Sequence, residues 1–362
     1  MRVSSPLWRS VEPFLYTQVD IRTPACLNAL LRTMNERPDL TASIQHLHIC
    51  RTIHADLGAA ANPDQLVLTT KRLLSLLSGL RSVHFDQWPA SPGILAESIQ
   101  GGGPAGFPKL KRVVLKERKT LINQLRPLWT LPAIESIESS VSAPEMMSNS
   151  WPTAATLQNL CLKPAVLEEK SLGLLLQACP SLKIFTYDRR CNVGDEPELL
   201  HCASLTTALH HVKGTLEELD FGVLLYSDYA EEVEYLEISP VLGHLGPLDS
   251  FKVLHKLKVP VAVLLGWFAK QAPSLADILP GSLSHLCLTE DLSSQCTYEW
   301  SEELVLQKLQ PFFAAARQTT PRLKTFELLP CRDFDRWAMP LEDRLRAMCS
   351  QHGITCIIPE NK

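Results

Sequence analysis

A six-residue pattern recurs along the chain, with apolar residues at its first, fourth and sixth positions. It occurs ten times, at residues 44–49, 80–85, 110–115, 134–139, 157–162, 182–187, 216–221, 254–259, 283–288 and 323–328. The last three positions alternate apolar, polar and apolar in most copies. The exceptions include the copy at 110–115, whose fifth position is Val114, and the copy at 134–139, which ends in Ser139. A short β-strand shows this alternation when one face is buried and the other meets solvent. Each copy therefore predicts a strand, and the related segment 354–359 predicts an eleventh.

The segments between these copies carry apolar residues at helical spacing. The predicted helices are residues 23–37, 63–77, 166–179, 197–212, 301–318 and 340–351. Proline near several of their starts suits the first turn of a helix. One strand and one helix cannot bury both of their apolar faces alone, but stacked units form a continuous parallel sheet with a helical layer outside it.

This alternation predicts an α/β fold, and the repeated pattern narrows it to a leucine-rich-repeat solenoid. We expect an irregular horseshoe with a parallel concave β-sheet and helices on the convex side. The repeats of regular families are roughly 20 to 29 residues long. Here the distance between the starts of successive copies exceeds this range in places, since one copy starts at 283 and the next at 323. An ordinary α/β domain, in which strands and helices also alternate, is the other interpretation.

The segment 3–49, "VSSPLWRSVEPFLYTQVDIRTPACLNALLRTMNERPDLTASIQHLHI", resembles fungal F-box proteins with C-terminal leucine-rich repeats. In that family the last F-box helix and the passage into the repeats carry a recognisable set of residues. The matching residues here are Val3, Ser4, Trp8, Arg9, Pro13, Leu15, Tyr16, Leu30, Leu31, Arg32, Arg37, Pro38, Asp39, Leu40, Ile44, Leu47 and Ile49. The phrases at 175–183 and 214–221 are similar to repeats of the same family.

The resemblance implies the substrate-binding part of an F-box receptor in a cullin-RING ubiquitin ligase. An F-box opens with a Leu-Pro-x-Glu-type segment and two further helices, and this sequence begins after them. We therefore expect the cullin-ligase adaptor to bind only if a full F-box is encoded upstream. The implied organisation is a remnant of the last F-box helix with an N-terminal cap at 1–39, irregular repeats at 40–339 with a long insertion at about 222–250, and a cap helix and strand at 340–362.

Composition narrows the class of protein. Hydrophobic residues make up 45% of the chain and charged residues 20%, which suits a folded core. The formal net charge of -4 provides no overall attraction to nucleic acid or acidic membranes. The longest apolar run, at 259–269, is too short to cross a bilayer, and the N-terminus lacks the apolar core of a signal peptide. The 11 cysteines show no metal-finger spacing, so we expect reduced thiols in a cytoplasmic and/or nuclear protein.

The solvent-facing positions of the predicted strands are the candidate binding residues. Early copies are basic, middle copies acidic and late copies basic again. The charged and imidazole candidates are His48, Arg81, His84, Lys111, Arg112, Glu217, Glu218, Asp220, Lys256 and Lys258. Trp88 after the second copy, and Tyr226 and Tyr229 in the acidic insertion, are candidate aromatic anchors. An insertion that is tolerated without a binding role is the other interpretation of this segment. Charges of both signs favour a folded protein partner over a uniform polyanion such as DNA.

Histidines gather on the first two predicted strands. Aligning these strands places His48 beside His84 at about 5 Å, with His46 on the same face. Two imidazoles at this spacing can share a metal ion, but a zinc site needs further ligands, and the sequence offers none at fixed spacing. We therefore predict no metal and favour a pH-sensitive binding patch.

The sequence lacks the nucleophile-elbow, Walker, dinucleotide-glycine and His-Glu-x-x-His motifs of enzymes. We predict a non-catalytic, monomeric interaction module for an unknown protein target, with no cofactor and with neither nucleic acid nor membrane as a partner. A standalone leucine-rich-repeat scaffold unrelated to ubiquitin is one alternative. An α/β-fold enzyme is another, and it would show a deep pocket with clustered titratable groups of shifted pKa.

Overall fold

The computed structural model describes residues 11–12, 14–50, 63–88, 90–101, 106–116, 120–141, 150–192, 199–226, 239–293, 295, 297–330 and 339–359. The chain divides into two compact units, Met1–Cys161 and Leu162–Lys362.

Twelve of the described strands form one parallel β-sheet, in which the strands follow one another in chain order. Those of the first unit are β1 (Gln18–Ile21), β2 (His46–Cys50), β3 (Ser82–Asp86), β4 (Arg112–Lys116) and β5 (Ser136–Val141). The unit boundary falls within β6 (Asn159–Ala165). Those of the second unit are β7 (Ile184–Asn192), β9 (Glu218–Tyr226), β11 (Lys256–Pro260), β12 (His285–Thr289), β13 (Thr325–Leu329) and β14 (Thr355–Ile357). Two short strands, β8 (Leu200–His201) and β10 (Val241–Leu242), pair separately in parallel.

Helices connect the strands. In the first unit they are α2 (Pro24–Glu36), α3 (Pro63–Leu76), α4 (Ser91–Gln100) and α5 (Ile122–Leu125), with 3-10 turns at Pro38–Leu40 and Arg126–Thr130. In the second they are α6 (Glu169–Gln177), α7 (Cys202–Leu209), α8 (Val261–Leu265), α9 (Leu275–Ile278), α10 (Glu302–Thr319) and α11 (Met339–Gln351), with 3-10 turns at His210–Val212 and Ala269–Gln271. Within the described ranges, no helix combines the length and apolar character needed to cross a bilayer.

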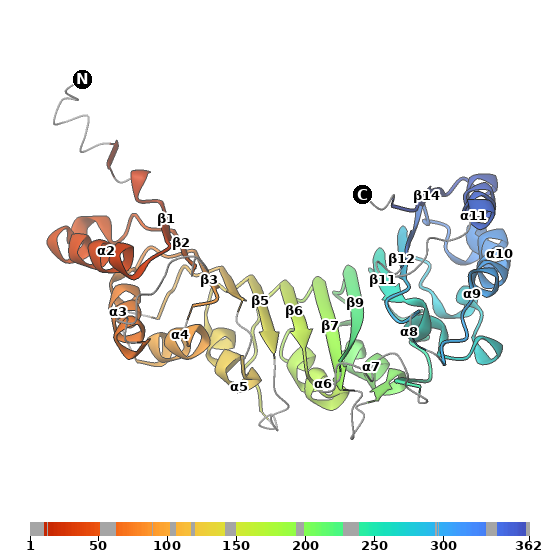
Figure 1. Ribbon diagram of the computed structural model, residues 1–362, viewed down its shortest axis with the longest axis horizontal. Helices are drawn as coiled ribbons and strands as arrows, with labels where there is room; N and C mark the ends of the chain where they lie inside the picture. The colour runs from red at the N-terminus through yellow and green to blue at the C-terminus, as the bar shows by residue number, and fades with distance from the viewer. Residues whose placement is uncertain are drawn as a thin grey trace. The chain divides into compact units, whose positions relative to one another are not determined.

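The repeated sequence pattern forms the strands that it predicts. Every one of the ten copies contains a strand of the large sheet, and that strand begins at the third residue of the copy. In the second copy the apolar positions are Leu80, Val83 and Phe85, and all three are buried. The helices lie along one face of the strands in each unit (Figure 1), and the apolar residues of the copies are buried. The predicted α/β fold with a parallel sheet is confirmed.

Backbone hydrogen bonds hold successive copies in the same register. The carbonyl oxygen of Gln45 accepts from the amides of Arg81 at 2.7 Å and Ser82 at 2.9 Å. The carbonyl of Arg81 accepts from Lys111 and Arg112 in the same way. Equivalent positions of neighbouring copies therefore lie directly side by side, which aligns their polar side chains on the face that no described helix covers.

The flanks of the predicted insertion at 222–250 belong to the packed fold of the second unit. Strand β9 continues to Tyr226, and Val241 lies in β10. Leu245 and Leu248 are fully buried. The described flanks of this segment therefore contribute apolar residues to the core. Its middle, including Tyr229, lies outside the described residues.

Candidate functional site

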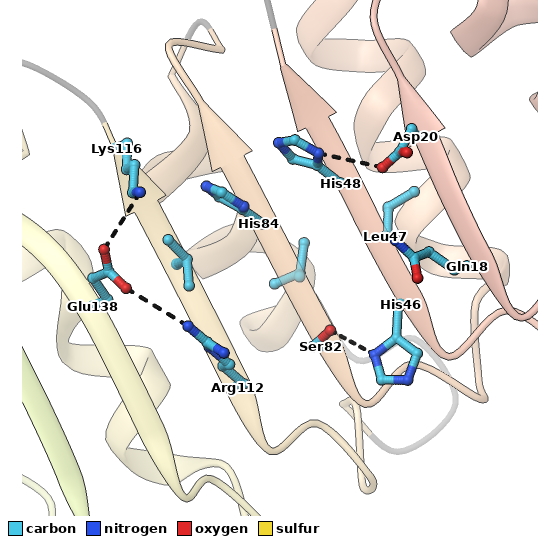
Figure 2. Close-up of a pocket in the computed structure, with 12 residues that line it drawn as sticks. Gln18, Asp20, His46, Leu47, His48, Ser82, His84, Arg112, Lys116 and Glu138 are labelled. Atoms are coloured by element: carbon cyan, nitrogen blue, oxygen red, sulfur yellow. Dashed lines mark hydrogen bonds and ion pairs between the residues drawn. The ribbon is translucent and has the colours of Figure 1, made fainter.

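The open face of strands β1–β5 carries a depression of about 310 Å³. Its middle row of side chains runs across five strands in register (Figure 2). In strand order this row is Asp20, His48, His84, Val114 and Glu138. The adjoining row contains Gln18, His46, Ser82 and Arg112, so polar groups from four separate strands surround the histidines.

The two central histidines stack. The ring centroids of His48 and His84 are 4.4 Å apart, with 18° between the ring planes. His48 Nδ1 lies 3.3 Å from Asp20 Oδ1, and the Nε2 atoms of both rings are buried without a hydrogen-bond partner. Burial lowers the pKa of His84 below its ordinary value of 6.5, and the neighbouring His48 lowers it further. The predicted side-by-side placement of these histidines is confirmed.

The stacked geometry does not suit a shared metal ion. An imidazole binds a metal through a lone pair in its ring plane. In two stacked, nearly parallel rings these lone pairs lie in separate, nearly parallel planes and do not converge on one position. Among the described residues, no group of three His, Cys, Asp or Glu side chains is arranged to hold a metal.

Cations border the histidines on β4. Arg112 Nη2 and Lys116 Nζ lie 3.8 Å and 3.6 Å from the two carboxylate oxygens of Glu138 on β5. Two cations therefore share one carboxylate, and both remain more than half exposed. Lys111 forms a closer ion pair with Glu135 at 2.7 Å, and Arg81, at the start of β3, is exposed.

Trp88 does not lie on this face. Its side chain is 2% exposed, and its indole Nε1 donates a hydrogen bond to Thr70 Oγ1 of α3 at 3.2 Å. The prediction that Trp88 anchors a partner is wrong for this structure, because the ring packs under the sheet with the helices.

In the second unit the predicted acidic and basic residues meet on adjacent strands. Strands β9 and β11 are neighbours, with Glu218 opposite Lys256 and Asp220 opposite Lys258. Their charged atoms are 3.6 Å and 3.3 Å apart, and Glu217 pairs with Lys183 of the β7 copy at 3.0 Å. The acidic copy at 216–221 and the basic copy at 254–259 therefore lie side by side, and their opposite charges form ion pairs across adjacent strands.

A second set of ion pairs involves β9 and the preceding strands β6 and β7. Lys163 Nζ contacts Asp220 at 3.1 Å and Asp188 at 3.5 Å. Burial raises the pKa of Asp188, while the Lys163 ammonium opposes that rise. A Cβ atom at Gly222, opposite Asp188 in the register, would lie 2.5 Å from its Oδ1. Glycine at this position leaves room for the carboxylate.

Tyr226 ends β9 in contact with the same unit. The guanidinium carbon of Arg190 lies 3.9 Å from the centre of the Tyr226 ring, a cation–π contact. The aromatic surface of Tyr226 is therefore partly engaged within the fold.

Several residues of the two faces were not among the candidates from sequence. Lys116, Lys163 and Asp188 each come directly after a copy of the six-residue pattern, where the strand continues by one more outward position. Extending the alternation by one residue would have found them. Asp20 lies on β1, which contains no copy, so the pattern provided no signal for it.

Comparison with known proteins gives no match: the chain fits no family model, and no curated protein is significantly similar to it in sequence. We therefore base the proposed function on the fold and on the geometry of the open face.

Proposed function

We propose that the chain is a leucine-rich-repeat protein of the solenoid type that binds another protein without catalysing a reaction. The observation that carries this proposal is the two-sided sheet of the first unit. Its apolar residues pack against the helices, while its outward positions present histidines, cations and carboxylates on the face left open by the described helices. Exposed strand faces of repeat architectures serve as extended binding surfaces.

The binding residues in this proposal are His48, Arg81, His84, Lys111 and Arg112. His48, His84 and Arg112 line the depression, and Arg81 and Lys111 directly precede strands β3 and β4. All five are at least partly exposed and able to form new ion pairs at a protein interface. Binding through mixed charges of this kind contributes specificity and association rate more than affinity.

Attachment to a ubiquitin ligase is part of the same proposal, carried over from the sequence resemblance to F-box proteins with leucine-rich repeats. A standalone scaffold would share the open face but not the ligase. We also propose residence in the cytoplasm or the nucleus, which is supported by the nine described cysteines that are free thiols.

Site-specific photo-crosslinking tests the binding function. Arg81 is exposed and directly precedes Ser82, which lines the depression. A photoreactive residue placed at Arg81 should crosslink a partner protein in cell extract. The same residue at Arg72, exposed on α3 on the helical side, is the matched control and should not capture that partner. Equal capture at both positions, or none at Arg81, would contradict the assignment of the open face. Recovery of the cullin adaptor in the Arg81 sample distinguishes a ligase receptor from a standalone scaffold.

A further inference from the structure

The fixed charges that line the depression of the first unit cancel. The permanently charged residues are two carboxylates, Asp20 and Glu138, and two cations, Arg112 and Lys116. Three histidines line the same space: His46, His48 and His84. The net charge of the depression therefore depends on how many of these imidazoles are protonated, which makes it a surface whose sign is set in the pH range where histidine titrates.

The stacked pair, which lines the depression, has unused hydrogen-bonding capacity. His48 turns Nδ1 to the carboxylate of Asp20, which fixes that nitrogen as the proton donor. Its Nε2, like that of His84, is buried and has no partner. On protonation each Nε2 becomes an N–H donor, and a donor beside a positive ring forms its strongest hydrogen bonds with carboxylate oxygens.

The groups around His84 set how it responds to a ligand. His48 on β2 and Lys116 on β4 disfavour a charge on its ring, while Asp86 on β3 and Glu138 on β5 favour one. Protonating both stacked rings places two like charges at a centroid separation of 4.4 Å. A carboxylate that enters the depression offsets this repulsion, so anion binding and proton uptake favour each other by linkage.

The positions of the two carboxylates in the row limit the kind of anion that can bind. Asp20 and Glu138 lie at the two ends of the row, four strand spacings apart, or roughly 19 Å. A uniform polyanion laid across the sheet would meet a carboxylate at each end. A short segment with a few carboxylates can instead place them over the histidines and β4 alone.

From this charge arrangement we propose that the depression is a docking site for an acidic segment of a partner protein, bound more tightly when His48 and His84 are protonated. This inference rests on the proposed protein-binding function and names the chemistry of its partner. Arg112 and Lys116 provide attraction at all pH values, because they share a single internal carboxylate.

Fluorescence anisotropy with the full chain and a labelled Glu-Ser repeat peptide tests the proposal. Since one linked proton changes Kd by up to tenfold per pH unit, we expect binding at pH 5.5 to be on the order of tenfold tighter than at pH 7.5. His48→Gln with His84→Gln should remove the pH dependence, and Arg112→Gln with Lys116→Gln should weaken binding at both pH values. His285→Gln, on the open face of the second unit beside Glu327, is the matched control and should retain the wild-type behaviour.

Three results would overturn the proposal. The first is that peptide binding does not change with pH. The second is that the pH dependence remains after both histidines are replaced, in a variant that circular dichroism shows to be folded. The third is that an oligonucleotide of equal charge binds more tightly than the peptide. Crosslinking at Arg81 separates the two levels of inference. A partner captured there without any affinity for the acidic peptide would reject the acidic segment and leave protein binding intact, whereas failure of both would reject both.

Discussion

Replacing Leu160 by aspartate tests the assignment of the inward face of β6. Leu160 is 1% exposed. Leu160→Asp therefore removes a buried leucine, whose burial contributes about 1.5–3 kcal/mol to the free energy of unfolding, and it introduces a carboxyl group in an apolar position. Burial raises the pKa of a carboxyl by up to about 3–5 units. At pH 7 this costs about 4 kcal/mol, because a carboxyl whose folded-state pKa lies above 7 stays protonated and the penalty cannot grow further. The sum approaches the whole stability of a typical domain, about 5–15 kcal/mol.

The sign of the pH dependence distinguishes the buried charge from the lost packing. The introduced carboxyl ionises near pH 4 in the unfolded chain and only at higher pH in the folded one. The charge penalty is therefore absent below about pH 4 and grows as the pH rises towards the folded-state pKa. Urea unfolding followed by circular dichroism should show a variant close to Leu160→Ala at pH 4 and far less stable than it at pH 7. Leu160→Ala itself should cost about 2–5 kcal/mol at both values.

A matched control lies one residue away on the opposite face. Asn159 is partly exposed, and Asn159→Asp adds the same charge to the same strand, so it should change stability by only about 0.5 kcal/mol. A chain with repeated units can unfold in stages, so all variants are compared through the midpoint of the same signal. Equal midpoints for Leu160→Asp and Asn159→Asp at pH 7 would refute the inward assignment and with it the two-sided sheet.

Three further predictions concern other sites. Burial and His48 lower the pKa of His84, so its NMR titration should have a midpoint below 6.5, and a midpoint above 6.5 would show that the environment favours the charged ring. The wild-type protein should therefore lose stability as the pH falls through 6.5, and His84→Gln should not show this loss. Gly222→Ala should lower the urea midpoint by the equivalent of about 1–3 kcal/mol, since its Cβ would crowd the carboxylate of Asp188, whereas Gly214→Ala, with no atom within 4 Å of the added Cβ, should be nearly neutral. Trp88→Ala should cost about 3–5 kcal/mol of stability in the same assay, and a fully stable variant that loses a partner would return Trp88 to the binding surface.

Much of the open face of the first unit follows from sequence alone. The alternation at 44–49 and 80–85 determines which side chains are buried, because burial depends on apolar character and is insensitive to the identity of the neighbour. Two copies with the same pattern must also stack in the same register, since a shift by one residue would turn the apolar set outward. The adjacency of His48 and His84 was therefore predictable, and the structure adds that their rings stack.

Tertiary structure alone decided how the charges combine. Whether Lys256 attracts a partner or neutralises Glu218 depends on which strands are neighbours and on how far a flexible side chain reaches, and neither is encoded in a six-residue pattern. The same holds for Trp88, whose large ring fits either a surface or a core, and which takes the core position where Thr70 of α3 accepts its N–H. Asp20 became part of the histidine site only because β1, which carries no copy of the pattern, pairs with β2. Local periodicity specifies faces because apolar burial is non-directional, whereas ion pairs and hydrogen bonds need particular partners at particular distances, and only the folded chain provides them.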